Sequence, residues 1–125
     1  AGLLNRVLLL EHSENVSTFY KCIHLFLLTS REDPYPLVVL EAAVNKIPSV
    51  CFSGSGGASE FIEGDAGTVI NYLDLVSMAN QVAYYYQNGN LLLAQGARAY
   101  EKVERWHLDK ELIVEQIEKV FNSLQ

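Results

Sequence analysis

Two carboxylates near the start of one predicted helix are the residues of this sequence best placed to do chemistry. Glu41 is the only charged residue in the apolar run Leu37 to Val44. This run predicts a helix over Leu37 to Lys46 that Pro48 ends. Because helical side chains lean toward the start of their helix, we expect Glu41 to face the preceding loop. Asp33 lies in that loop, eight residues earlier.

The start of the same helix offers backbone donors. The N–H groups of Leu37, Val38 and Val39 have no acceptor within the helix, and with the helix dipole they favour an anion such as phosphate. Carboxylates would repel a phosphate that they touched, so they suit neutral hydroxyls on either side of it. A sugar diphosphonucleoside has this layout. The alternative is that Glu41 caps its own helix or pairs with Arg31.

The glycine-rich segment Ser53 to Gly57 is a second candidate, because it follows a predicted strand and opens a helix. It could cradle a phosphate, but it has neither the dinucleotide-binding glycine spacing nor the lysine of a P-loop. We favour a permissive turn at the rim of a cleft, with Gly56 and Gly57 in the turn and Glu60 as an acid near a helix N-terminus. Cysteines and histidines show no metal-ligand spacing, so we expect no metal and no cofactor.

Short apolar runs alternate with helical patterns along the chain. Strands are predicted at 7–10, 23–28, 49–52 and 67–70, and helices at 15–22, 37–46, 58–62, 73–87, 91–104 and 110–124, with a break at 106–109. This order predicts an α/β fold: a Rossmann-like parallel sheet of about four strands with helices on both faces and a helical C-terminal extension. Ligands of such sheets bind beyond the carboxyl ends of the strands, which here means residues 29–37 and 53–58.

Composition narrows the classes of function. Half of the 125 residues are hydrophobic and the net charge is -6, which is typical of a globular domain and argues against a nucleic-acid partner. The sequence shows no signal peptide and no apolar run of the roughly 20 residues that span a membrane. It opens with Ala1 and Gly2, and we interpret it as a piece of a longer protein.

Several segments in order resemble family 4 of the retaining glycosyltransferases, enzymes of the GT-B fold. Asp33 stands at the first glutamate of that family's E-x7-E motif and Glu41 at the second. The similarity spans roughly Gly2 to Leu108. The matching segments are Phe26 to Ala42, Ile47 to Val50, Gly56-Gly57, Glu60-Phe61-Ile62 and Asp65-Ala66-Gly67 with Val69.

The resemblance implies a role for each motif residue. Asp33, as the catalytic position, would contact a hydroxyl of the donor sugar, and Glu41 would bind the ribose. Backbone N–H groups near Leu37 and Val38 would meet the diphosphate of a nucleotide sugar, without a metal. Pro36 replaces a glycine that is common in the family, and it removes a backbone donor from the loop.

The resemblance also implies how the chain relates to the rest of its protein. Residues 1–108 would be a partial donor-binding domain whose first strands are missing. The helix in 109–125 would cross toward an absent N-terminal domain that binds the acceptor. An Arg/Lys pair that usually neutralises the leaving diphosphate has no counterpart here. We therefore expect this piece to be inactive by itself and to self-associate through open strand edges.

The expected function of the longer protein is transfer of a sugar from a nucleotide-diphosphate donor to a hydroxyl acceptor, with retention, in the cytoplasm. Peripheral association with the inner face of a membrane stays open. One alternative is a sugar-nucleotide epimerase-like protein, which shares the GT-B fold. The other is a non-catalytic α/β interaction or regulatory domain, which would not need Glu41 within an apolar helix.

Overall fold

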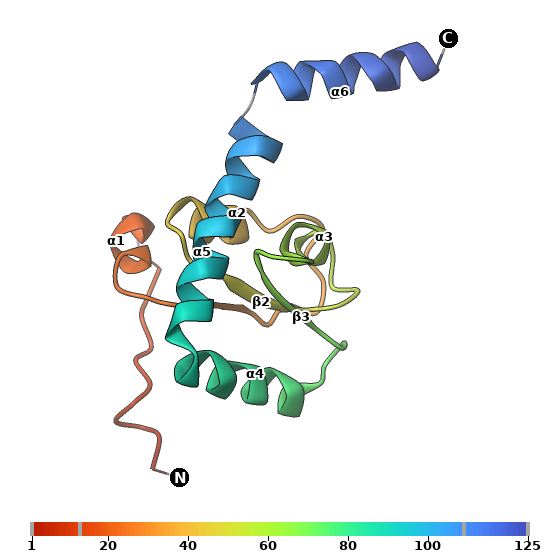
Figure 1. Cartoon of the computed structure of the whole chain (residues 1–125). Helices are drawn as coiled ribbons and strands as arrows, with labels where there is room; N and C mark the ends of the chain where they lie inside the picture. Colours follow the sequence, from red (N-terminus) through yellow and green to blue (C-terminus); the bar gives the residue numbers. More distant parts are fainter. Residues whose placement is uncertain (1, 13, 109, 125) are drawn as a thin grey trace.

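A three-stranded parallel sheet forms the centre of the molecule (Figure 1). The computed structural model describes residues 2–12, 14–108 and 110–124. The strands are β1 (Phe26–Leu28), β2 (Ser49–Phe52) and β3 (Gly67–Ile70), in the order β1-β2-β3. Val50 lies opposite Leu27 on one side and Thr68 on the other. The predicted α/β class and Rossmann-like parallel sheet are confirmed.

Helices cover both faces of the sheet, as predicted. On one side lie α2 (Leu37–Val44) and α3 (Ala58–Ile62), and on the other lies α4 (Leu75–Gln87) (Figure 1). The long α5 (Gly89–Val103) packs at the end of the sheet. It contributes side chains to two hydrophobic cores, one on each face of the sheet. The short α1 (Val16–Tyr20) lies beside α2 and is linked to it through Tyr20.

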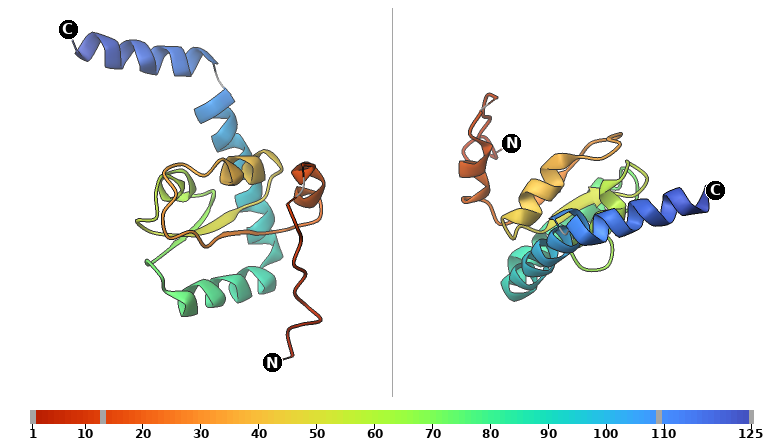
Figure 2. Two further views of the ribbon diagram at one scale, coloured as in Figure 1. Left: turned by 180° about the vertical axis from the view of Figure 1, so that it is seen from behind. Right: turned by 90° about the horizontal axis from the view of Figure 1, so that it is seen from above.

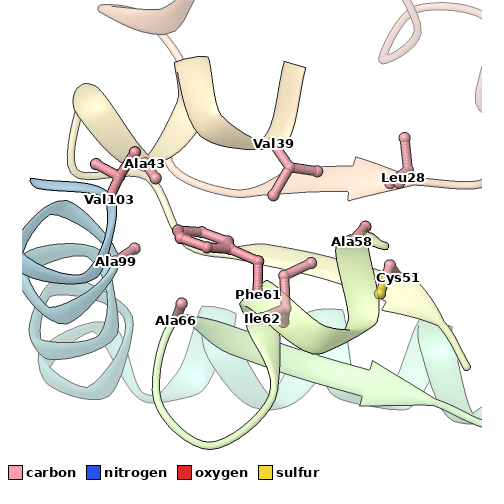
Figure 3. Packing of buried hydrophobic residues seen from close by; sticks show 10 residues of the cluster. All are labelled: Leu28, Val39, Ala43, Cys51, Ala58, Phe61, Ile62, Ala66, Ala99 and Val103. Atoms are coloured by element: carbon pink, nitrogen blue, oxygen red, sulfur yellow. The ribbon is translucent and has the colours of Figure 1, made fainter. Parts of the chain in front are cut away.

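Strand β2 belongs to both cores because successive side chains of a strand point to opposite faces. Cys51 points toward α2 and α3, where it joins Val39 and Phe61 in the larger core (Figure 3). Val50 and Phe52 point the other way. All four residues of β2 are buried, which fits the apolar side chains of Val50, Cys51 and Phe52.

The prediction of a strand at Val7 to Leu10 is wrong. These residues lie in an exposed segment without regular structure, and Leu8 and Leu9 are 78% and 91% exposed. The apolar run has the composition of a buried strand, but a strand also needs a partner edge. Within the described residues nothing pairs with this segment, so the sheet has three strands and not about four.

Strand β1 is shorter than the predicted span of Ile23 to Leu28. Its partner β2 begins at Ser49, directly after Pro48. The residues before Pro48 form the turn that ends α2, where Lys46 has a φ of 60°. Residues 23–25 therefore have no extended neighbour with which to pair, and β1 covers only Phe26–Leu28.

The predicted break at 106–109 is also different in the structure. Residues 106–108 are helical, in a π-helical turn that follows α5, η1 (Glu104–Leu108), and a further helix, α6, covers Lys110–Ser123. Asp109 lies outside the described residues. Helix α6 has no buried residue and points away from the sheet (Figure 2), so the helical C-terminal extension is confirmed. No helix in the described part of the chain is long and apolar enough to cross a membrane.

We predict that the chain self-associates, because the outer edge of β1 has no paired strand in the described residues and residues 3–10 expose a run of leucines. Light scattering should show a mass above that of a monomer that rises with concentration. Leu8→Lys with Leu9→Lys should shift the chain toward the monomer. The control is Tyr86→Lys, since Tyr86 is equally exposed but lies on α4. A strict monomer at all concentrations would contradict this prediction.

Candidate functional site

Two loops at the carboxyl ends of the strands are joined by backbone hydrogen bonds. The loop after β1 contains Asp33, whose N–H donates to the carbonyl of Ser55 in the loop after β2 at 2.7 Å. The N–H of Gly57 donates back to the carbonyl of Pro34 at 2.9 Å. Asp33 and Gly56 thereby form an isolated parallel bridge. These bonds fix the backbone position of Asp33.

The two glycines permit this close approach. Gly56 has a φ of +137°, and a Cβ there would overlap the carbonyl of Asp33. A Cβ on Gly57 would press on the ring of Tyr35 and on the Pro34 carbonyl. Because the Gly57 N–H is already bonded to Pro34, it is not a free donor for a phosphate. The geometry favours the turn interpretation of this segment over a phosphate cradle.

Glu60 lies exposed on α3, the helix that follows the glycine turn. Burial, and then the negative charge of Glu60, raise the pKa of Tyr35. The structure shows no ion pair of Glu60 within the described residues.

The Asp33 side chain is half-buried, and its carboxylate has no hydrogen bond or ion pair among the described residues. The backbone of the residue is fixed while its acceptor oxygens remain available. A carboxylate in this state can accept hydrogen bonds from neutral hydroxyls.

The N-terminus of α2 begins directly after this loop. Pro36 is the N-cap residue and supplies no side-chain cap. The N–H of Val39 donates to the Pro36 carbonyl at 3.1 Å, so the expectation that it is free is wrong. The N–H groups of Leu37 and Val38 have no acceptor in the described part of the chain. Two backbone donors, and not three, thus face outward here.

Glu41 accepts a hydrogen bond from the hydroxyl of Tyr20, 2.9 Å from its Oε2 atom. The same hydroxyl lies 3.3 Å from the carbonyl oxygen of Val38, one turn nearer the start of α2. The carboxylate therefore lies beside the first turn of its helix, as the lean of helical side chains predicts. Within the described residues Arg31 forms no ion pair with it, and it does not cap α2.

Tyr20 is the residue of this site that the sequence did not single out. Its ring is buried between α1 and α2 and packs with Ala42 and Ile47. Burial, and then its hydrogen bond to the Glu41 carboxylate, raise the pKa of Tyr20 to about 12. The sequence feature that could have pointed to Tyr20 is a tyrosine at the end of a short helix before an apolar run. A tyrosine buried in such a place needs a hydrogen-bond partner for its hydroxyl.

A pocket of about 390 Å³ opens between α1 and α2 beside this hydrogen bond. It is lined by Glu14, Val16, Ser17, Tyr20, Glu41, Val44 and Asn45. Asp33 is not part of this lining. Among the described residues, no group of three or more His, Cys, Asp or Glu side chains is arranged to hold a metal ion.

Comparison with known proteins identifies the family and the fold of the chain. Residues 1–88 match the family described as glycosyl transferases group 1. A lipopolysaccharide core biosynthesis mannosyltransferase from Rhizobium leguminosarum is 27% identical over 99% of this chain, which covers 35% of that protein. The chain thus spans about a third of the length of this relative.

Two solved structures have the same fold. Sucrose-phosphate synthase from Thermosynechococcus elongatus superposes with a TM-score of 0.80 at 21% identity, over 98% of this chain and 31% of that one. The C-terminal domain of a group 1 glycosyl transferase from Francisella tularensis superposes with a TM-score of 0.70 at 16% identity, over 81% and 52%. The chain therefore belongs to the group 1 family of glycosyltransferases and corresponds to part of their C-terminal, Rossmann-like domain.

Proposed function

We propose that these residues bind the sugar-nucleotide donor of a retaining glycosyltransferase that transfers the sugar to a hydroxyl acceptor. One observation carries the proposal. The N–H groups of Leu37 and Val38 at the start of α2 are without acceptors in the described chain, and in the sequence they lie between Asp33, whose carboxylate is available, and Glu41, whose carboxylate is hydrogen-bonded.

Each part of the donor has a partner of suitable chemistry. The diphosphate lies at the N–H groups of Leu37 and Val38, where the helix dipole also favours negative charge. The ribose hydroxyls donate to Glu41, beside the pocket between α1 and α2. Asp33, in the loop before α2, accepts a hydrogen bond from a hydroxyl of the sugar that is transferred. Pro36 sets the start of α2, and Gly56 and Gly57 hold the Asp33 loop, with Glu60 at the rim.

The chemical step needs stabilisation of the charge that develops on the leaving diphosphate. In this proposal the two N–H groups and the helix dipole supply one part of it. A basic pair from the rest of the longer protein supplies the other part, and its N-terminal domain binds the acceptor. Residues 1–108 are then the donor-binding unit, and 109–125 reach toward that other domain.

The matched relative is a mannosyltransferase of lipopolysaccharide core biosynthesis. We therefore place the longer protein in polysaccharide biosynthesis, using sugar nucleotides in the cytoplasm, with contact to the inner face of the membrane where its acceptor requires it.

The first prediction separates the two carboxylates in the longer protein. Glu41→Ala should weaken donor binding by about 1 to 3 kcal/mol, because charged hydrogen bonds to the ribose are lost. Asp33→Ala should lower kcat more than donor affinity, because Asp33 touches the transferred sugar. Calorimetry with nucleotide sugars and steady-state kinetics measure the two effects. Equal and negligible effects of both substitutions would refute the assignment.

The second prediction concerns the glycine turn. Gly56→Ala should weaken donor binding about tenfold or more, because a Cβ would displace the Asp33 carbonyl and move the loop. Gly54→Ala is the matched control, since Gly54 also has a positive φ, of +70°, but a Cβ at that position would have no atom within 4 Å. Both variants are compared by thermal unfolding and by titration with nucleotide sugar. Equal loss of donor affinity in both would argue against a role for the Asp33 loop.

The third prediction is that the 125-residue chain alone transfers no sugar and binds a nucleoside diphosphate only weakly, with a Kd of roughly 1 mM. The reason is that the acceptor domain and the basic pair are contributed by other parts of the longer protein. Product analysis with a panel of nucleotide sugars tests this. Robust transfer by this chain would show that the chemistry lies in residues other than those named here.

A further inference from the structure

The Tyr20–Glu41 hydrogen bond joins a rigid donor to an otherwise unrestrained acceptor. Tyr20 is 6% exposed and packs with Ala42 and Ile47, and its ring lies 6.5 Å from the ring of Phe26, centroid to centroid. The hydroxyl is therefore held in one place at the surface of α2. Glu41 is an exposed residue, and in the described chain its carboxylate has this tyrosine as its hydrogen-bond partner.

Holding the carboxylate in one rotamer has a free-energy consequence for any ligand. A free glutamate side chain loses conformational freedom when it is fixed. Where the folded protein already fixes the side chain, the ligand does not have to order it on binding. A neutral hydroxyl suits this purpose, because it leaves the negative charge in place. A lysine or arginine partner would instead compete with the ligand for the carboxylate.

The number of hydrogen-bond acceptor positions on the Glu41 carboxylate also fits a ribose ligand. A carboxylate offers about four lone-pair positions, and the Tyr20 hydroxyl uses one of them on Oε2. The remaining positions can accept from both hydroxyls of a ribose at the same time. The pocket between α1 and α2 adjoins this carboxylate and has room for a group of that size, at about 390 Å³.

We propose that Tyr20 is a positioning residue that holds the Glu41 carboxylate against the first turn of α2. In that position the carboxylate accepts hydrogen bonds from both ribose hydroxyls of a nucleoside diphosphate. This inference rests on the donor role proposed for Glu41. Tyr20 itself does not touch the reacting atoms. Its hydroxyl acts through Glu41. Because the same hydroxyl lies beside the Val38 carbonyl, the Glu41 carboxylate is held near the turn of α2 where the diphosphate would bind.

A double-mutant cycle on the 125-residue chain tests this inference. The variants are Tyr20→Phe, Glu41→Ala and both together, titrated by NMR with UDP and GDP and with their 2′-deoxy forms. Tyr20→Phe keeps the buried ring and removes the hydroxyl. It should weaken binding of the ribonucleotide about threefold to tenfold and reduce the preference for it over the deoxy form. In the Glu41→Ala background the same substitution should have no further effect.

A matched control guards against a general effect of removing a tyrosine hydroxyl. Tyr100 donates to Glu104 Oε1 at 2.8 Å, an equivalent tyrosine–glutamate bond in the C-terminal half of the chain. Tyr100→Phe should leave nucleotide affinity and the ribose preference unchanged. Thermal unfolding of all variants shows whether each is folded, and a second substitution, Glu41→Gln, removes the charge without changing Tyr20.

The ionisation of Tyr20 gives a readout that is independent of ligand. Since the Glu41 carboxylate contributes to raising the pKa of Tyr20 to about 12, Glu41→Gln should lower that pKa. Because the folded-state pKa is raised, the stabilisation from protonated Tyr20 is complete below pH ~10 and is lost as the pH rises through the folded-state pKa. Tyrosinate absorbance of the chain and of Tyr20→Phe isolates this group by difference.

The outcomes separate this inference from the proposed function. Loss of ribose preference in Tyr20→Phe, absent in the Glu41→Ala background, supports it. Unchanged affinity and ribose preference in Tyr20→Phe, with Glu41→Ala still weakening binding, overturn the role of Tyr20 and leave the donor site in place. No binding of UDP or GDP, or binding that Glu41→Ala does not alter, overturns the donor site and the role of Tyr20 with it.

Discussion

The arrangement of the whole site depends on the pairing of β2 with a parallel strand on each side. Both sides of its backbone are bonded and all four of its residues are buried, so β1 and β3 have fixed registers relative to it. Parallel strands end at one edge, and the loops after β1 and β2 therefore emerge together. Their hydrogen bonds through Asp33 and Gly57 follow from that pairing.

The site combines parts that differ in how firmly they are held. The backbone at Asp33 is fixed by the neighbouring loop, while its carboxylate is left available. Glu41 is the reverse case: it lies on an exposed face of a regular helix, and a tyrosine from another helix holds its side chain. The first turn of α2 also presents two backbone donors. Rigid supports around available acceptors are what a polyhydroxylated anionic ligand requires.

Much of the fold and part of the candidate site could be predicted from the sequence, because they depend on local sequence rules. The position of Glu41 follows from helix geometry and from the apolar residues around it, and the start of α2 follows from the apolar run that begins at Leu37. Tyr20 could not be assigned, because its partner lies twenty-one residues away and depends on how α1 packs on α2. Val7 to Leu10 was misassigned for a related reason: composition indicates a strand, but pairing decides whether one forms. The contact of Gly56 with the Asp33 loop is likewise a tertiary contact. The sequence predicted a turn that needs glycine there, but not which loop it would meet.

The most direct test of the donor site is amide chemical-shift mapping of this chain with UDP and GDP. The account predicts that the largest changes fall on the N–H groups of Leu37 and Val38, with smaller ones around Tyr20 and Glu41. The N–H of Gly57, already bonded to Pro34, should change little. Changes that leave Leu37 and Val38 unaffected and fall instead on the apolar pocket around His24, Tyr86 and Leu92 would contradict it.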